Sequence, residues 1–430
     1  MSSEVAAVPL EDCLDALIDY RGKTPVKTLS GIPLITAKII KAGRIEKPTE
    51  FIAKDNYDSW MRRGIPKAGD VVLTVEAPLG EVAQLGAEKI ALAQRVVTLR
   101  GKVGVLDNTY LLYLLQTEEM QEQLKARATG TTVLGIKQSE LRKVLLRLPT
   151  IEAQVSAAAT LKAIDDRIAL LRETNTTLEA IAQALFKSWF VDFDPVNAKA
   201  QGNAPEGMDK ATAALFPDSF EESELGLVPK GWRVKALDEV ADYLNGLALQ
   251  KFPPDDDEGL PVIKIAQLRK GDTVGADRAS RKMKQEYIIQ NGDVLFSWSG
   301  SLEVEVWCGG EGALNQHLFK VTSNTYPKWF YYLWTKYHLE SFRQTAASKA
   351  TTMGHIQRVH LSQAKVIAPS DEFVSSADKY FAPILDRWIA NALQVQTLAT
   401  LRDTLLPRLI SGQLRLSDTA DIITETLSGI

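Results

Sequence analysis

The residues of this sequence with the clearest chemistry are Lys and Arg side chains that gather in clumps. Lys and Arg neutralise backbone phosphates, so such clumps are typical of a surface that binds nucleic acid. Solvated surface charge is the alternative explanation for any single residue, but the clumps recur in both halves of the chain near the same sequence landmarks. The basic residues that we expect to contact phosphates or bases are Lys23, Lys38, Lys41, Arg44, Lys264, Arg269, Lys270 and Arg358.

The net charge needs to be divided along the chain before it can be used. The 430 residues include 50 Lys and Arg against 54 Asp and Glu, a net charge of -4, which by itself argues against a nucleic-acid partner. Counted by segment, however, residues 1–150 hold 21 basic and 18 acidic side chains, and residues 231–370 hold 17 and 15. The acidic excess therefore lies in the remaining segments, and two weakly basic regions are left as candidates for binding DNA.

Other kinds of chemistry find little support in the sequence. Cys13 and Cys308 lie far apart, so neither a disulfide framework nor a zinc site is indicated, and a reducing cytoplasm is the expected compartment. Gly22-Lys23-Thr24 lacks the leading glycine of a phosphate-binding loop. No run of about 18 apolar residues is available to span a membrane. The histidines without metal-ligand spacing are His317, His338, His355 and His360. We expect a chain that catalyses nothing and binds no cofactor or metal itself.

The elements that position the basic clumps come in two copies. An ordered series of short strings in the first half returns in the second half at an offset that drifts only from 228 to about 220 residues. Such a series predicts the duplication of one domain. The clearest paired strings are Gly31–Ile35 with Gly259–Ile263, Ala68–Leu73 with Asn291–Phe296, Ala93–Arg95 with Asn315–His317, and Thr131–Ile136 with Thr351–Ile356.

Each copy has the pattern of a mixed domain. Helical spacing predicts helices over residues 109–128 and 326–346. Short apolar and β-branched runs bounded by Gly, Pro and Asp predict strands at 71–75, 95–99, 262–265 and 294–298. The expected fold is therefore α+β, with two similar α/β domains in tandem and a pseudo-two-fold internal repeat.

A long helical pattern follows each copy. Apolar residues at alternating steps of three and four run from Leu161 to Trp189 and from Phe381 to Leu409, which predicts an antiparallel two-helix coiled coil between the domains. A long amphipathic helix lying on a domain core is the alternative. Each seam has one polar break, Asn175 or Asn391. In an antiparallel pair centred near residues 172 and 392 these two side chains face each other, and we predict that they fix the register.

These patterns divide the chain into six segments. A stretch rich in Ala, Gly, Pro and acidic residues separates the first helix from the second copy and is predicted to be a linker. The predicted segments are a first domain (1–150), a first helix (151–194), the linker (195–230), a second domain (231–370), a second helix (371–412) and a C-terminal tail (413–430).

A duplicated domain with a coiled-coil helix after each copy resembles the specificity subunit of type I restriction-modification systems. The likeness covers nearly the whole chain and is most specific near its end. One departure is Ser370-Asp371-Glu372, where the Leu-Pro-x-x-Glu-x-Gln junction of the first copy has no good counterpart. The matching strings are Gly31–Pro33, Gly69–Leu73, Gly130–Thr132, Leu148–Gln154, Ala184–Phe193, Pro229–Trp232, Gly292–Leu295 and Leu401–Gly412.

The resemblance implies that each copy is a target-recognition domain for one half of a split, asymmetric DNA site. The helices then act as a spacer, because a helix of about 35 residues is roughly 50 Å long and half-sites one turn apart are separated by about 34 Å. Arg, Lys and Gln can bridge purine edges, and Thr can contact a base edge or a thymine methyl. The base-reading candidates beside the basic clumps are Thr36, Lys38, Thr131, Thr132, Gln138, Gln267, Arg269, Thr351, Thr352, His355 and Arg358.

The resemblance also implies partners. It indicates two methylation subunits, which use S-adenosylmethionine to methylate adenine, and two motor-nuclease restriction subunits that act in phage defence. The candidate docking residues for these partners are Trp189, Phe190, Phe193, Leu406 and Arg408. Packing into the chain's own core is the alternative for the aromatic residues among them.

Two other functions remain as alternatives. A fused DNA adenine methyltransferase requires a glycine-rich cofactor motif and an Asp-Pro-Pro-aromatic motif, and the sequence offers only Asp192-Phe193-Asp194-Pro195, which lacks the second proline. A coiled-coil scaffold that binds proteins without DNA fits the net negative charge but not the repeated basic clumps.

Overall fold

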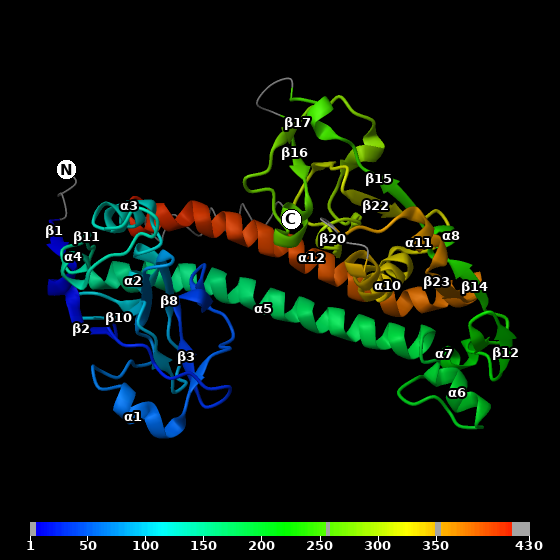
Figure 1. Cartoon of the computed structure of the whole chain (residues 1–430), viewed down its shortest axis with the longest axis horizontal. Coiled ribbons are helices and arrows are strands. Elements are labelled where there is room, and N and C mark those ends of the chain that lie inside the picture. Colours follow the sequence, from blue (N-terminus) through cyan, green and yellow to red (C-terminus); the bar gives the residue numbers. More distant parts are fainter. Residues whose placement is uncertain (1–5, 255–258, 349–353, 415–430) are drawn as a thin grey trace. The chain divides into compact units, whose positions relative to one another are not determined.

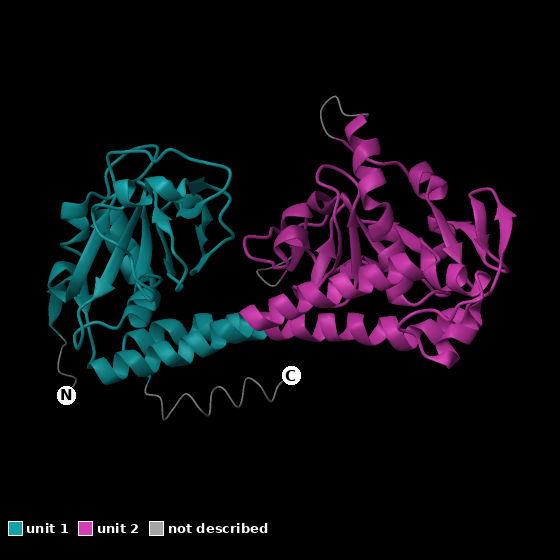
Figure 2. Cartoon of the chain, turned by 90° about the horizontal axis from the view of Figure 1, so that it is seen from below, with its two compact units in different colours: residues 1–168, 397–430 teal, residues 169–396 magenta. Residues whose placement is uncertain are grey.

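The structure, a computed structural model, describes residues 6–254, 259–348 and 354–414. It contains two long helices, α5 (Ile151–Phe190) and α12 (Asp371–Ile410) (Figure 1). The chain forms two compact units, unit 1 from residues 1–168 and 397–430 and unit 2 from residues 169–396 (Figure 2). Each long helix therefore contributes one part to each unit. In the parts of the chain that the structure describes, no helix is long and apolar enough to cross a membrane.

Unit 1 is built on a four-stranded antiparallel sheet. Its strand order is β2 (Leu14–Asp19), β10 (Val96–Gly101), β7 (Val71–Val75) and β8 (Leu79–Gln84). All five residues of β7 are buried, so the strand is a continuous apolar and Thr run instead of an alternating pattern. Helix α2 (Asn108–Leu114) packs against β7, β8 and β10. The predicted strand at 71–75 is confirmed with these bounds.

A second, smaller sheet in unit 1 carries the Gly-Ile-Pro landmark. Strand β3 (Ile32–Ile35) lies between β6 (Phe51–Ile52) and β9 (Ala91–Leu92), and it runs parallel to β9. The other elements of unit 1 outside α5 and α12 are β1 (Ala7–Pro9), β4 (Ile40–Lys41), β5 (Arg44–Ile45), α1 (Tyr57–Trp60), α3 (Glu118–Ala126), α4 (Gln138–Leu141), β11 (Leu145–Arg147) and short 3₁₀ turns.

Unit 2 repeats this architecture. The order of its main antiparallel sheet is β15 (Asp242–Asn245), β22 (Leu318–Thr322), β19 (Val294–Ser297) and β20 (Val304–Val306). Its second sheet has β16 (Leu260–Ile263) parallel to β21 (Gly312–Leu314), flanked by β17 (Arg278–Ala279) and β18 (Ile288–Ile289). The remaining elements are α6 (Asp194–Ala200), α7 (Lys210–Leu215), β12 (Phe220–Ser223), β13 (Gly226–Pro229), β14 (Arg233–Ala236), α8 (Leu237–Val240), α9 (Ile265–Lys270), α10 (Lys328–Ser348), α11 (Arg358–Gln363) and β23 (Lys365–Ala368).

The two units have the same strand order, so the prediction of two similar domains of mixed helix and strand is confirmed. In the parallel strand pairs, Ile35 lies opposite Leu92 in unit 1 and Ile263 lies opposite Leu314 in unit 2. Two predicted elements differ. The strand predicted at 262–265 is β16, which ends at Ile263, and Ile265 begins α9. The helix expected over 109–128 is two helices, α2 and α3, because the Thr117 side chain accepts a hydrogen bond from the backbone N–H of Met120 and begins a new helix. The predicted domain limits stay predictions, since each long helix belongs to both units.

Helices α5 and α12 pack against each other in antiparallel fashion. Within unit 2, Asn391 Nδ2 donates to Asn175 Oδ1 at 2.9 Å, while Trp189, further along α5, contacts Phe381 and Phe373, which lie earlier in α12. Asn175 Nδ2 also donates to the Trp388 carbonyl at 2.9 Å. The two asparagines therefore face each other as the heptad spacing predicts, and their control of the register remains a prediction.

Within unit 1, a charged pair joins the same two helices. Arg402 Nη1 of α12 donates to Asp165 Oδ1 of α5 at 2.9 Å, and the hydroxyl of Tyr113 donates to the second oxygen of Asp165 at 2.8 Å. Burial alone would lower the pKa of Arg402, but the hydrogen bonds from Arg402 to Asp165 and Asp403 raise it overall. One carboxylate thus ties α5 to both α12 and α2.

Candidate nucleic-acid interface

The predicted basic residues of unit 1 lie in three different settings. Lys23 is exposed in the loop after β2, and the Lys38 side chain is 80% exposed and lies 4.0 Å from Glu50. Lys41, on the β4–β5 hairpin, pairs with Glu46 at 2.9 Å but remains more than half exposed. Arg44 is half-buried and donates to the Asp165 carbonyl of α5 at 3.2 Å. Lys23, Lys38 and Lys41 are therefore exposed to solvent, where phosphates could reach them, whereas Arg44 contacts α5.

Two predicted base-reading residues are buried, and this part of the prediction is wrong. Thr36 is only 9% exposed, between β3 and the following turn. Gln267 is 7% exposed, and its Oε1 accepts a hydrogen bond from the Lys264 backbone N–H at 3.3 Å. The Gln267 side chain thus caps the start of α9 instead of reaching solvent. Each residue is less than a tenth exposed.

The predicted Thr loop of unit 1 is exposed. Thr131 and Thr132 lie between Thr129 and Gly135, whose backbones exchange hydrogen bonds at 2.8 and 2.9 Å. Gly130 closes this loop with a φ of +115°, and a Cβ there would lie 2.2 Å from the Val133 carbonyl oxygen, so only glycine fits. Gln138 is half-buried in the first turn of α4. The counterparts of Thr131 and Thr132 in the second copy, Thr351 and Thr352, lie outside the described residues.

Two of the four predicted basic residues of unit 2 are paired with acidic groups. Lys264 pairs with Asp277, and Arg269 Nε lies 3.9 Å from Glu303. Arg269 and Lys270 line a cavity of about 520 Å³ whose other walls include residues of α5 and α12. This setting favours a role for Arg269 beside the helix pair and does not support a base contact there.

Arg358 and His355 lie close to the main sheet of unit 2. Arg358 Nη2 donates to the Tyr243 carbonyl at 2.9 Å, and its guanidinium lies 5.6 Å from the ring centroid of Phe319. These contacts indicate that Arg358 holds α11 against the sheet. His355 is exposed, and its ring centroid lies 6.3 Å from that of Trp298. His355 therefore stays a candidate for contacting DNA.

The candidate docking residues fall into two groups, those that are buried and those that are half-buried or exposed. Trp189 is 4% exposed and Phe190 is fully buried, and both belong to the aromatic core of unit 2, so their assignment as docking residues is wrong. Phe193 is half-buried, Leu406 is half-buried and Arg408 is exposed, so these three stay candidates.

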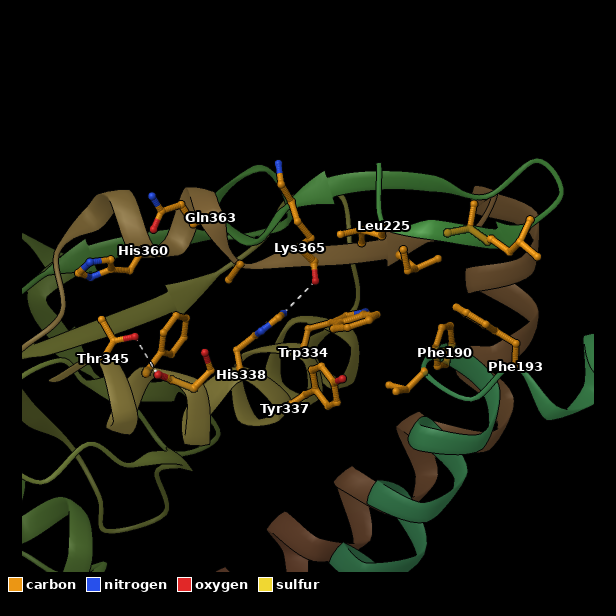
Figure 3. A pocket seen from close by; sticks show the side chains of 17 residues that line it. Phe190, Phe193, Leu225, Trp334, Tyr337, His338, Thr345, His360, Gln363 and Lys365 are labelled. Atoms are coloured by element: carbon orange, nitrogen blue, oxygen red, sulfur yellow. Dashed lines mark hydrogen bonds between the residues drawn. The ribbon is translucent and has the colours of Figure 1, made fainter. Parts of the chain in front are cut away.

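Phe193 lines a cavity of about 520 Å³ in unit 2, between the end of α5, α10 and β23 (Figure 3). Leu225 and Leu227 also line this cavity and are 51% and 63% exposed. The His338 side chain points toward β23, where its Nε2 donates to the Lys365 carbonyl at 2.9 Å. Burial lowers the pKa of His338, and this hydrogen bond opposes the shift only in part.

A set of side chains that the sequence analysis did not single out lies at one edge of the main sheet of unit 1. We call it the strand-end edge: the residues at the ends of β2 and β7, at the start of β10, and beside the Thr loop. Glu76, after β7, lies 4.0 Å from Arg95, which precedes β10, and the two side chains are 44% and 49% exposed. The Thr loop joins this edge because the Ile136 N–H donates to the Val75 carbonyl at 3.0 Å. Arg21 Nη1 donates to the Ile136 carbonyl at 2.6 Å.

Unit 2 has a strand-end edge at the same place in its sheet, with different side chains. The Ile356 N–H donates to the Trp298 carbonyl at 2.9 Å, as Ile136 does to Val75 in unit 1. Ser299 Oγ lies 2.9 Å from His317 Nδ1, and Trp298 Nε1 donates to Asn245 Oδ1 at 2.9 Å. The signal in the sequence was the landmark Ala93–Arg95 with Asn315–His317, which keeps its central Gln in both copies but changes its first and last residues.

Metal chemistry finds no support in the described ranges, where no group of three or more His, Cys, Asp or Glu side chains could hold an ion. Cys13 and Cys308 are both free and buried. In unit 1 the edge of the main sheet presents the exposed side chains of Glu76 and Arg95, an arrangement suited to contacting another molecule.

Comparison with known proteins agrees with this architecture. A family model described as the type I restriction modification DNA specificity domain matches residues 18–180 and again residues 229–402. The type I restriction enzyme MjaIX specificity subunit of Methanocaldococcus jannaschii is 27% identical over 365 residues, covering 83% of this chain and 80% of its own length. The HindI specificity subunit of Haemophilus influenzae is 26% identical over 383 residues, covering 76% and 82%.

A solved structure supports the fold. The S subunit of a type I restriction-modification system from M. genitalium matches with a TM-score of 0.56 at 15% identity, covering 94% of this chain and 95% of that chain. At this identity the likeness concerns the fold alone. Because the family model matches well over half of the residues, once in each repeat, the chain belongs to the family of type I restriction modification DNA specificity domains.

Proposed function

We propose that this chain is the DNA-specificity subunit of a type I restriction-modification complex, in which each unit reads one half of a bipartite, asymmetric site. The observation that carries the proposal is that the family match falls once on each of two units with the same strand order. Two copies of one reader with different exposed residues suit a site whose halves differ in sequence. The chain then confers specificity and leaves catalysis to its partners.

The exposed lysines of unit 1 supply the part of the DNA-binding affinity that does not depend on sequence. Lys23, Lys38 and Lys41 are exposed, and a Lys held near a phosphate releases counterions without reading bases. The weak basicity of residues 1–150 and 231–370 suits a protein that obtains much of its affinity from the subunits bound to it. We expect Lys41→Ala to lower affinity for all DNA sequences and to reduce the salt slope by about one.

The helix pair serves as the spacer and as a docking surface. Helices α5 and α12 each have 40 residues, about 60 Å of helix at 1.5 Å per residue, which is enough to span more than one turn of DNA. Two methylation subunits and two restriction subunits are the proposed partners, with S-adenosylmethionine bound by the methylation subunits. Phe193, Leu406 and Arg408 remain the docking candidates of this chain.

Selection of DNA by the assembled complex tests the proposal. The chain, purified with the methylation subunits of its own system, selects binders from a pool of duplexes with a randomised region of about 30 base pairs. We expect enrichment of two short unlike motifs separated by a fixed gap. No enrichment, or a single uninterrupted motif, would contradict the proposal. The methylation subunits alone, without this chain, are the control and should select nothing.

A further inference from the structure

The two strand-end edges occupy equivalent positions, which the hydrogen bonds of the sheets define independently of the side chains. In unit 1, Val97 lies opposite both Asp19 and Leu73, and in unit 2, Phe319 lies opposite both Asn245 and Phe296. The register continues to the strand ends, where Glu76 bridges to Gly135 and Ser299 bridges to His355. Glu76 therefore corresponds to Ser299, and Arg95 corresponds to His317.

In each unit the side chains at these two equivalent positions contact each other, but their chemistry differs between the units. Unit 1 has an exposed ion pair between Glu76 and Arg95, and unit 2 has a hydrogen-bonding contact between the buried Ser299 and the half-buried His317. The neighbouring residue is Gln in both units, Gln94 and Gln316. Gln316 Nε2 lies 3.3 Å from His317 Nε2, so the histidine ring is held on both sides.

A duplicated DNA reader divides its residues into two classes. Residues that serve the fold or contact phosphates can stay the same in both copies, because neither task depends on sequence. Residues that read bases must differ if the two half-sites differ. The strand-end edges meet this second condition at the 76/299 and 95/317 positions, while their backbone contacts, from Ile136 to Val75 and from Ile356 to Trp298, stay the same.

We infer that the strand-end edges are the base-reading surfaces of the two units and that the Glu76–Arg95 and Ser299–His317 pairs set which bases each unit selects. The inference rests on the proposed function. Arg offers two donors that match the major-groove edge of guanine, and Glu accepts from the amino group of cytosine. The half-site of unit 1 therefore contains a G·C pair read by Glu76 and Arg95. In unit 2, Ser299 is 4% exposed and positions the half-buried His317, whose ring contacts the bases.

Exchanging the pairs between the units tests this inference. The variant Glu76→Ser with Arg95→His gives unit 1 the pair of unit 2, and the selection from randomised duplexes is repeated with the variant complex. We expect the preference for one G·C pair to fall by about tenfold or more, with the change confined to one half-site and the other half-site and the gap unchanged. An unaltered motif would overturn the inference.

A matched control makes the same two substitutions in a Glu–Arg ion pair that lies away from the strand-end edge. Glu119 and Arg147 form an exposed ion pair at 2.9 Å elsewhere in unit 1, and Glu119→Ser with Arg147→His should select the wild-type motif. A changed half-site in this control would also overturn the inference. If the edge variant does not fold, Glu76→Gln, which keeps the size of the side chain, replaces it under the same two outcomes. Failure of the proposed function is distinct, because the wild-type complex would then select no gapped motif.

Discussion

The two units share a sheet order but hold the long helices by different means. Unit 1 joins α5 to α12 through the charged pair of Asp165 and Arg402, with Tyr113 on the same carboxylate. Unit 2 joins them through the amides of Asn175 and Asn391 and through an aromatic core in which the ring of Phe190 contacts those of Phe373 and Phe381. The comparison shows that the repeat preserves strand pairing, while the chemistry of helix contacts and of strand ends differs between the copies.

This difference separates two requirements on the sequence. Strand order and the parallel pairs β3–β9 and β16–β21 must recur, because both units need the same frame. The helix contacts need only fit the partner helix, and the strand ends need only fit their own target. Positions whose residue type differs between the copies are therefore the ones to examine for DNA specificity. Positions whose residue type is the same in both copies are the ones to examine for the fold.

The aromatic core of unit 2 should give the largest effect on stability. Phe190 is fully buried among Trp232, Trp329, Phe330 and other rings, so Phe190→Ala should lower the free energy of unfolding by about 3–5 kcal/mol. Denaturant unfolding measures the loss, and hydrogen exchange should place it in unit 2. Leu170→Ala is the control, because Leu170 is 53% exposed on the same helix and should change stability by less than about 0.5 kcal/mol. Equal losses in the two variants would contradict this assignment.

The asparagine pair should give an intermediate effect. Asn391 is 2% exposed, so Asn391→Ala leaves the Asn175 amide without one partner at a cost of about 1–3 kcal/mol. Replacing both by Leu should restore much of this stability and weaken the specification of the register. A double-mutant cycle measures the coupling between the two side chains. Additive single losses would show that the asparagines do not act as a pair.

The charged pair of unit 1 should give a smaller effect that depends on salt. Asp165 and Arg402 are about a quarter exposed, so Asp165→Asn should cost roughly 1 kcal/mol after screening by solvent. Unfolding at low and at high salt separates this pair from the neutral pair of unit 2, since only the charged pair weakens as salt is added. A loss from Asp165→Asn that is the same at both salt concentrations would contradict the assignment.

His338 should give the smallest effect, visible only in acid. Burial lowers its pKa in the folded state, so the unfolded state binds a proton more readily. Its contribution to stability is complete above the ordinary value near 6.5 and is lost as the pH falls below it. His338→Gln should flatten the dependence of the unfolding free energy on pH between about 7 and 5. An unchanged slope would show that His338 is not responsible.

The repeat and the helix pairing could be predicted from the sequence because both follow from spacing alone. The facing of Asn175 and Asn391 follows from the heptad pattern, which a rigid helix translates directly into position. The burial of Thr36 and Gln267 could not be predicted, because it depends on tertiary packing after β3 and on the Gln267 side chain turning back to cap α9. For Trp189 and Phe190 the sequence left two interpretations open, and aromatic residues at a helix end fit a core and an interface equally well.

The strand-end edges were missed for a related reason. Glu76 and Arg95 are 19 positions apart, and they meet only because β7 and β10 are antiparallel neighbours. The sequence marked Arg95 as part of a repeated landmark but gave no indication of its partner. Comparing the two copies for positions that keep their place and change their chemistry would have found both pairs.

The central claim is that each unit reads its own half of the DNA site through its own edge. The most direct test is the motif selected by the variant His317→Arg, which changes the half-buried position of unit 2 that corresponds to Arg95 and leaves the buried Ser299 in place. We expect a change confined to the half-site that the unit 1 variant leaves intact, with a new preference for a G·C pair there. A change in the same half-site as the unit 1 variant, or in both halves, would contradict it.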